Sequence, residues 1–379
     1  MTPRAASEEP DEIADAQRGE RASRIVGEER RRGRGARSNV GGRYESERRA
    51  DFDDGWESLA DLGPWRTEVR SELAKSIIST NDSPDLSFDQ SINPYRGCEH
   101  GCIYCYARPT HCYLGHSAGL DFETRLYAKT NAAELLEKEL ARPGYVPKTI
   151  ALGAVTDPYQ PIERTLRITR SLLEVLERTG HPVGIVTKSA GILGDLDILV
   201  RMAERRLVKV AISVTTLDRA LARSMEPRAA TPPRRLEAIE QLAEAGVPVT
   251  VMVAPIVPAL NDSEIEAILE AAATAGAREA GYVLLRLPLE LKSLFREWLE
   301  TDHPARASRV ISLLRSMHGG RDYVATFGHR QKGSGPYAEQ IAARFRLAQK
   351  RHGLERRALG LRTDLFRKPV GPGGQMSLL

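Results

Sequence analysis

Short apolar runs alternate with amphipathic segments along most of the chain after residue 149. Each run is followed by polar residues and has the length of a single β-strand, whereas the stretches between runs carry apolar residues at helical spacing. Strand and helix recur at intervals of about 25–40 residues, which is the spacing that right-handed parallel crossovers need. The predicted strands are residues 86–92, 149–155, 183–187, 208–215, 249–257 and 280–287.

The intervening segments carry the start and stop signals of helices. Residues 164–180 place their apolar positions on one face and end at Gly180. Residues 233–246 and 261–276 begin at Pro or Asn and also end at Gly. Six parallel strands are fewer than the eight of a closed barrel. The pattern therefore predicts an α/β fold, either a curved, partial (β/α)6 barrel of the TIM type or a doubly wound sheet.

The composition divides the chain into four parts. Residues 1–66 are rich in charged residues, Gly and Ser, so they cannot bury enough apolar surface to offset chain entropy. We interpret them as a disordered charged arm, in which an arginine cluster that includes Arg34 and Arg37 is solvated, with phosphate contact as the alternative. The barrel is expected over residues 67–288. The other parts are a helical C-terminal extension over 289–368, with helices near 289–300, 305–317 and 338–352 around a glycine-rich loop at 328–335, and a flexible tail over 369–379.

The overall charge and hydropathy exclude some classes of protein. Lys and Arg number 55 against 51 Asp and Glu, so the net charge of +4 does not by itself indicate a nucleic-acid partner. No stretch approaches the ~18 uncharged apolar residues of a membrane helix. The first residues lack the apolar core of a signal peptide. The sequence therefore predicts a cytoplasmic protein with no membrane partner.

All four cysteines lie in one short stretch, NPYRGCEHGCIYCYARPTHC. Thiolates gathered in this way suit a soft metal or an iron–sulfur cluster better than a disulfide framework. Cys98, Cys102 and Cys105 have the spacing C-x3-C-x2-C, with which one loop can supply three ligands to a cubane and leave its fourth iron open. Two alternatives use Cys112 as a fourth ligand, a zinc site and a saturated electron-transfer cluster, but neither explains a large α/β barrel downstream.

This loop, together with TDPYQPIE at residues 156–163, resembles the radical S-adenosylmethionine (SAM) enzymes, and more narrowly the branch that contains spore photoproduct lyases. The resemblance covers roughly residues 91–288 and includes the six-strand partial barrel. It implies that Cys98, Cys102 and Cys105 hold a [4Fe-4S] cluster whose open iron binds SAM. Reduction of that cluster would cleave SAM to methionine and a 5′-deoxyadenosyl radical that acts on substrate. It also implies an electron donor such as flavodoxin or ferredoxin, and it allows DNA or RNA as substrate.

Polar residues at the strand ends are candidates for SAM binding, because chemistry in such barrels lies at the carboxyl ends of the strands. The resemblance places Thr156 and Asp157 near the amino group of SAM, where the alternative is an ordinary turn. Lys188, with Ser189 beside it, ends the third strand, and its charge needs water or an anion such as the SAM carboxylate. Glu163 is expected to begin the next helix.

Two further residues match the family on the cofactor side. Ser213 resembles the serine that hydrogen-bonds SAM, with a backbone-bonded core serine as the alternative. Tyr104 matches the aromatic residue near the adenine, although it could equally brace the loop. His100 and His111 are interpreted as polar residues flanking the cluster and not as ligands.

The match to the lyases themselves is incomplete. Those enzymes use a cysteine downstream of the cluster loop as hydrogen donor, and this chain has no cysteine after Cys112. Tyr106, which follows the last ligand, does match the tyrosine that the family links to the radical relay. We therefore predict a related radical enzyme with Tyr106 as its catalytic residue. The alternatives are a photoproduct lyase-like repair enzyme and an iron–sulfur or zinc module that binds nucleic acid without turnover.

The last five residues suggest a partner. They resemble the short peptide by which bacterial replication and repair proteins bind the sliding clamp, and they follow a flexible PVGPGG linker that would let the peptide search. The alternative is a chance match to a degenerate pattern. The peptide consists of Gln375, Met376, Ser377, Leu378 and Leu379.

Overall fold

The computed structural model describes residues 26–45, 64–355 and 360–369. One seven-stranded sheet forms its centre, in the order β10-β9-β8-β7-β6-β3-β2. Every neighbouring pair from β3 to β10 is parallel, and only β2 runs antiparallel to its neighbour β3. The strands are β2 (Ile78–Thr80), β3 (Gln90–Ile92), β6 (Ile150–Leu152), β7 (Val183–Thr187), β8 (Val208–Ser213), β9 (Val249–Ile256) and β10 (Glu279–Leu284).

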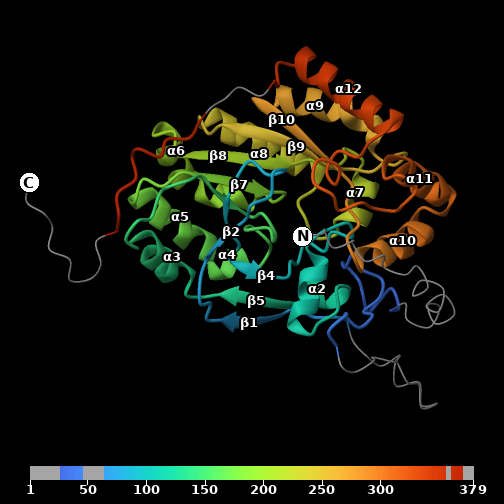
Figure 1. The fold of residues 1–379 in the computed structure, drawn as a ribbon, viewed down its shortest axis with the longest axis horizontal. Coiled ribbons are helices and arrows are strands. Elements are labelled where there is room, and N and C mark those ends of the chain that lie inside the picture. The colour runs from blue at the N-terminus through green and yellow to red at the C-terminus, as the bar shows by residue number, and fades with distance from the viewer. Residues whose placement is uncertain (1–25, 46–63, 356–359, 370–379) are drawn as a thin grey trace, which may run out of the picture.

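The six parallel strands follow chain order across the sheet, which confirms the partial barrel. A doubly wound sheet would reverse its strand order at a switch point, and no such reversal occurs here. Helices connect successive strands and cover the sheet (Figure 1). They are α5 (Ile168–Arg178), α6 (Leu196–Glu204), α8 (Pro232–Glu244) and α9 (Ile265–Thr274), with shorter turns α4 (Glu163–Leu166), η3 (Ala190–Asp195), α7 (Arg219–Met225) and η4 (Asp262–Glu264).

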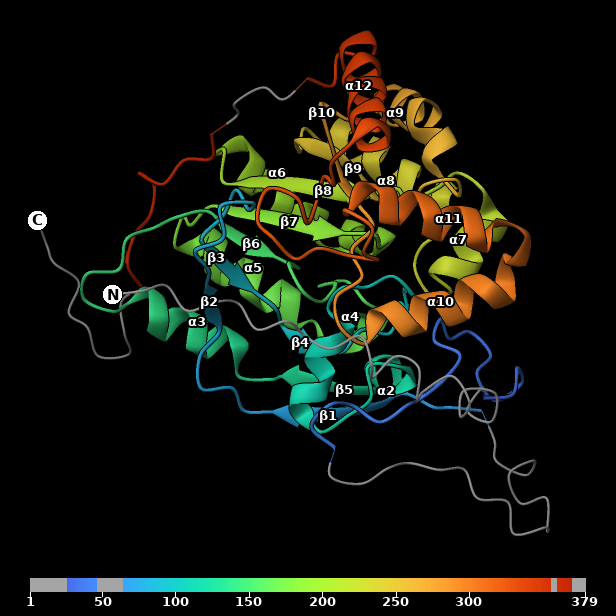
Figure 2. The ribbon, with the colours of Figure 1, turned by 45° about the vertical axis from the view of Figure 1, so that its right-hand side comes forward.

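A second, three-stranded sheet lies beside the large one, in the order β1-β5-β4 (Figures 1 and 2). The sequence pattern did not predict this sheet, because its strands are short and carry many charged residues. It supports the cysteine loop, which leaves β4 and continues into η2. Its elements and neighbours are β1 (Glu68–Glu72), β4 (Tyr95–Arg96), η2 (Arg108–Leu114), α2 (Leu120–Thr124), β5 (Arg125–Lys129) and α3 (Ala132–Leu140).

The three helices predicted for the C-terminal extension are present as α10 (Leu291–Asp302), α11 (Pro304–Met317) and α12 (Pro336–Arg351). Beyond them, residues 360–369 run along the amino ends of the strands. The amide of Arg367 donates to the carbonyl of Thr179 at 2.8 Å, and the ring of Phe366 packs against His181. The predicted flexible tail lies, from residue 370 onward, outside the described residues.

Part of the predicted disordered arm is folded, so the prediction for residues 1–66 is wrong over 26–45. The Arg34 side chain is buried and donates to the Glu123 carbonyl at 3.0 Å and to Thr67 Oγ1 at 2.9 Å. Arg37, also buried, pairs with Asp302 on α10. These charged contacts replace the apolar burial that the segment lacks. Residues 1–25 and 46–63 lie outside the described part of the chain.

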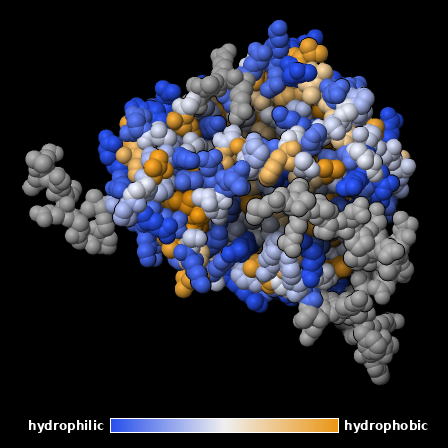
Figure 3. All heavy atoms as spheres, in the orientation of Figure 1, coloured by the Kyte–Doolittle hydropathy of each residue, from blue (hydrophilic) through white to orange (hydrophobic). Residues whose placement is uncertain are grey.

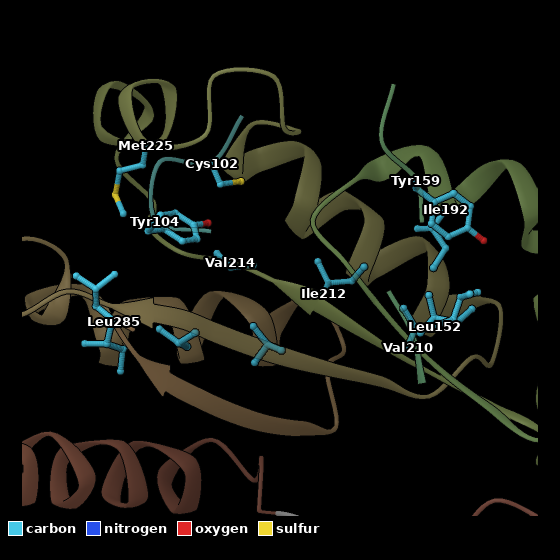
Figure 4. Close-up of a cluster of buried hydrophobic side chains, with 14 of the residues drawn as sticks. Cys102, Tyr104, Leu152, Tyr159, Ile192, Val210, Ile212, Val214, Met225 and Leu285 are labelled. Atoms are coloured by element: carbon cyan, nitrogen blue, oxygen red, sulfur yellow. The ribbon is translucent and has the colours of Figure 1, made fainter. Parts of the chain in front are cut away.

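The core lies between the sheet and its helices and reaches the cysteine loop. Figure 4 shows Cys102 and Tyr104 beside Met225 at one end of a row of apolar side chains that includes Val210 and Ile212 of β8. The face seen in Figure 3 is largely polar, with apolar residues in small groups. Within the described residues, no helix has the length and hydropathy to cross a membrane.

Candidate active site

The cysteine loop, residues 97–107, leaves β4 and lies against the carboxyl ends of the large sheet. Cys98 and Cys102 are buried, Cys105 is partly buried, and all three thiols are free. Burial raises the pKa of each thiol, and the Asp157 charge adds to this effect at Cys98. Three thiols in this environment become thiolates only when a positively charged metal group binds them.

The donor set fits an iron–sulfur cluster better than a single metal ion. Among the described residues, no three His, Cys, Asp or Glu side chains converge to hold one ion. A cubane, in contrast, needs one thiolate at each of three separate irons. Cys112 lies in η2, where its sulfur packs against Gly42, and burial raises the pKa of its thiol to about 11. The structure therefore gives no support to a four-cysteine zinc site.

A completely buried arginine fixes the backbone of the loop. Arg108 donates to the carbonyls of Cys102 at 2.8 Å and Gly101 at 3.0 Å, and it pairs with Glu123 at 2.5 Å. Glu123 is also completely buried and accepts the amides of Gly35 and Ala36 at 2.9 and 2.8 Å. The folded part of the N-terminal arm is thus bonded to the carboxylate that holds the loop arginine.

The TDPYQPIE segment holds the other side of the loop. The side-chain oxygen of Gln160 accepts the amide of Glu99 at 2.9 Å. His100 Nδ1 faces an Asp157 carboxylate oxygen at 3.4 Å. The residues between the first two cysteines are therefore positioned by the end of β6.

Asp157 ties the ends of β6 and β7 together. Its carboxylate accepts the Thr187 hydroxyl at 2.6 Å and the Lys188 amide at 2.9 Å. Burial acts to raise the pKa of Asp157, but the charge of His100 and these hydrogen bonds outweigh burial and lower it to about 2. Both oxygens serve protein donors, so the predicted contact of this side chain with a SAM ammonium stays a prediction.

Two other predicted binding residues have structural partners for their hydroxyls. Thr156 Oγ1 donates to the Tyr95 carbonyl at 3.0 Å. Ser189 Oγ accepts the amide of Gly191 at 3.1 Å and so caps η3. Ser213, the last residue of β8, is buried, and its carbonyl accepts Arg235 Nη1 at 3.0 Å. No hydrogen bond of the Ser213 hydroxyl is seen within the described residues, which leaves it open to a ligand.

Lys188 lies in a group of buried charged side chains that the sequence did not predict. Its Nζ lies 3.8 Å from a Glu226 carboxylate oxygen and 5.6 Å from the centre of the Tyr104 ring. Glu226 is completely buried, pairs with Arg235 and accepts the Tyr104 hydroxyl. Two cationic side chains therefore face one carboxylate, and the surplus positive charge suits an anionic ligand beside the loop.

Tyr106 lies at the rim of the site. The residue is 41% exposed, and its hydroxyl donates to the carbonyl of Ala154, just after β6. The guanidinium of Arg286, just after β10, lies 4.5 Å from the centre of the Tyr106 ring. Tyr106 thus lies between the ends of β6 and β10, next to the third cysteine.

Glu163 begins α4, as predicted, and has a further role. It accepts the Tyr95 hydroxyl and the amide of Thr169 in α5. Burial raises the pKa of Glu163 to about 7 despite these hydrogen bonds. The group is therefore protonated in the folded protein at pH values where it ionises in the unfolded chain.

This raised pKa predicts a pH-dependent stability. Between about pH 5 and 7 the folded state binds more protons at Glu163 than the unfolded state, so the free energy of unfolding should fall as pH rises through this range, by up to about 3 kcal/mol. Glu163→Gln should flatten this slope in denaturant titrations between pH 5.5 and 8. Glu174→Gln on the exposed face of α5 is the matched control, and equal slopes in the two variants would contradict the assignment.

Comparisons with known proteins agree with this geometry. A family model described as the radical SAM superfamily matches residues 92–272. An uncharacterized protein of Mycobacterium tuberculosis (strain H37Rv) is 39% identical over 246 residues, which span 64% of this chain and 72% of that protein. An uncharacterized protein of Methanocaldococcus jannaschii is 26% identical over 199 residues, which span 52% of this chain and 71% of that protein.

Solved structures of spore photoproduct lyase are similar in fold. The lyase complexed with dinucleoside spore photoproduct gives a TM-score of 0.55 at 17% identity, over 75% of this chain and 79% of that one. A lyase variant with bound AdoMet and the same dinucleoside gives 0.55 at 18% identity, over 75% and 78%. At this level of identity the similarity establishes a shared fold.

Proposed function

This chain belongs to the radical SAM superfamily, and we propose that it is an enzyme that holds a [4Fe-4S] cluster on Cys98, Cys102 and Cys105. The family uses this cluster and SAM as cofactors. When bound, they supply a 5′-deoxyadenosyl radical that removes a hydrogen atom from substrate. The observation that carries the proposal is the loop of three free cysteines, two of them buried and one partly buried, against the carboxyl ends of a six-strand parallel barrel.

The protein's own side chains would bind and orient SAM. The Lys188 ammonium suits the SAM carboxylate, because Glu226 neutralises only one of the two cations around it. The Ser213 hydroxyl and the Tyr104 ring flank the same region. Thr156, Asp157 and Ser189 shape the strand ends through the bonds described above, and in this proposal they offer backbone groups to the cofactor.

Replacing Lys188 tests this arrangement. A charge-assisted hydrogen bond contributes about 1.5–3 kcal/mol, so Lys188→Ala should weaken SAM binding roughly 10- to 150-fold while iron content stays unchanged. Lys138→Ala on the exposed face of α3 is the control. SAM affinity is measured by anaerobic calorimetry. Unchanged affinity in the Lys188 variant would mean that Lys188 pairs with Glu226 and does not bind SAM.

For the substrate we propose a nucleic acid, DNA or RNA. The support is the fold similarity to a lyase solved with a dinucleoside photoproduct. The reaction differs from that of the lyases in its last step, because the chain has no cysteine after Cys112 to return a hydrogen atom. Tyr106 at the rim is the proposed relay residue. The test is SAM cleavage with DNA, RNA and protein added separately, and stimulation by protein alone would contradict the proposal.

A non-catalytic iron–sulfur or zinc module that binds nucleic acid is the second candidate, and it would bind nucleic acid without cleaving SAM.

Two partners complete the proposal: an electron donor such as flavodoxin or ferredoxin, and a bacterial sliding clamp bound through Gln375, Met376, Ser377, Leu378 and Leu379. These five residues lie outside the described structure, so their role rests on the sequence. Titration of the chain against a clamp, with and without residues 375–379, tests this role. Equal binding by the two chains would show that these residues do not bind the clamp.

A further inference from the structure

A pocket of about 360 Å³ opens beside the cysteine loop, and the Lys188 side chain does not line it. The loop itself contributes to its wall, together with the segment after β6, the start of η3 and the connection between α7 and α8. Its principal side chains are His100, Tyr159, Arg164, Ser189, Arg228 and Arg234.

The pocket wall is bonded directly to the segment between the first two cysteines. His100, which is 2% exposed, accepts the amide of Arg228 on its carbonyl at 3.3 Å. The Arg228 guanidinium pairs with Glu99 at 3.2 Å. Two successive residues of the cysteine loop thus contact the same surface connection. His100 lies two residues from both Cys98 and Cys102 in the chain, so this surface adjoins the loop that carries the proposed ligands.

The rim of the pocket is strongly basic, although the whole chain carries a net charge of only +4. Arg164, Arg228 and Arg234 line the pocket and are exposed. Glu99 under Arg228 and a carboxylate that pairs with Arg234 at 2.5 Å are the acids that face them. Arg164 forms no ion pair in the described part of the chain. The surface therefore keeps a local excess of positive charge that attracts anions.

We propose that this arginine surface, formed by Arg164, Arg228 and Arg234 around His100, is the docking site of the acidic protein that delivers electrons to the cluster. The inference rests on the proposed function. Each SAM cleavage consumes one electron, which the donor loses and which neutralises the sulfonium as its bond to C5′ breaks. No proton is needed in this step.

Two observations favour a protein donor at this position. All four cysteines lie in one stretch, so the sequence offers no second cysteine-based centre to relay an electron. Because electron transfer slows steeply with distance, the donor must bind where the loop approaches the surface. Charges on the rim of an interface steer association and make it salt-dependent. An arginine rim therefore suits a partner with an acidic face around its redox group.

The test separates docking from catalysis. In the double variant Arg164→Glu/Arg234→Glu, we expect dithionite-driven formation of 5′-deoxyadenosine to be unchanged. With reduced bacterial flavodoxin as donor, the KM for flavodoxin should rise about 10-fold or more at low salt, and the difference should shrink at high salt. Calorimetric titration with oxidised flavodoxin should show the same weakening without turnover. Arg346→Glu/Arg351→Glu on α12 carries the same charge change as control.

Each outcome has one meaning. Equal flavodoxin dependence in the two double variants would overturn the docking site. Loss of SAM affinity in Arg164→Glu/Arg234→Glu, or competition with SAM by inorganic phosphate, would overturn it in favour of a small-anion pocket. Absence of dithionite-driven cleavage in the wild-type protein would instead overturn the proposed function itself.

Discussion

Replacing any one of Cys98, Cys102 and Cys105 by alanine should remove nearly all cluster iron, whereas Cys112→Ala should retain it. Two thiolates hold a cubane poorly, because one iron loses its only protein ligand. Cys112 is instead packed in η2 against Gly42, with a thiol pKa raised to about 11 by burial. Iron and sulfide per chain and the visible absorption after anaerobic reconstitution measure the effect.

Cys112→Ala is also the matched control for this experiment, since it removes the same atoms from the same stretch of chain. Equal loss of iron in all four variants would support a site with four cysteine ligands. Full iron in one of the first three variants would mean that the loop does not supply three ligands.

Arg108→Met should destabilise the protein by about 3–5 kcal/mol, because the change leaves the Glu123 carboxylate buried without its partner. The same change frees the carbonyls of Gly101 and Cys102. Chemical denaturation of the cluster-free protein separates this effect from cluster loss. The double variant Arg108→Met/Glu123→Gln should be less destabilised than the sum of the two single variants, since the residues are coupled.

Arg142→Met, on a side chain that is 61% exposed, is the control for this prediction, and it should stay within about 0.5 kcal/mol of wild type. A single substitution usually changes the free energy of unfolding by about 1 kcal/mol. If Arg108→Met stays within about this interval of wild type, the role assigned to the buried pair is contradicted.

The strands β6 to β10 of the large sheet were predictable because they are apolar, whereas β2 was not predicted and β3 (Gln90–Ile92) begins four residues after the start of the predicted run 86–92. The observed strand β8 (Val208–Ser213) ends two residues before the predicted run 208–215. Beyond its end, the Thr215 hydroxyl donates to the Glu226 carboxylate at 2.6 Å. The cysteine spacing likewise predicted three candidate ligands, and all three thiols are free in the structure. Both signals are local in the sequence, so a single chain reveals them.

The groups that hold the loop were not predictable in the same way. Arg108 and Glu123 look like surface residues, since charged residues are rarely buried unless paired, and the pairing is visible only in three dimensions. The same holds for Glu226, whose partner Arg235 lies nine residues further along. Arg108 and Glu226 stand between apolar neighbours in the sequence, which is a weak local signal of their burial.

The interpretation of Lys188 changes once its partner in the structure is known. A lysine that ends an apolar strand needs an anion, and from sequence the SAM carboxylate is the anion at hand. The structure supplies Glu226 at 3.8 Å and adds Arg235 to the same carboxylate. Lys188 is therefore not an isolated charge. The surplus positive charge of Lys188 and Arg235 beside Glu226 favours an anionic ligand.

Cleavage of SAM is the measurement that tests the central claim most directly. The protein is reconstituted with iron and sulfide without oxygen, reduced with dithionite and incubated with SAM, and 5′-deoxyadenosine is quantified by chromatography. We expect the wild-type chain to form 5′-deoxyadenosine and methionine and Cys102→Ala to form neither. A wild-type protein that carries a full cluster and yields no 5′-deoxyadenosine would contradict the claim.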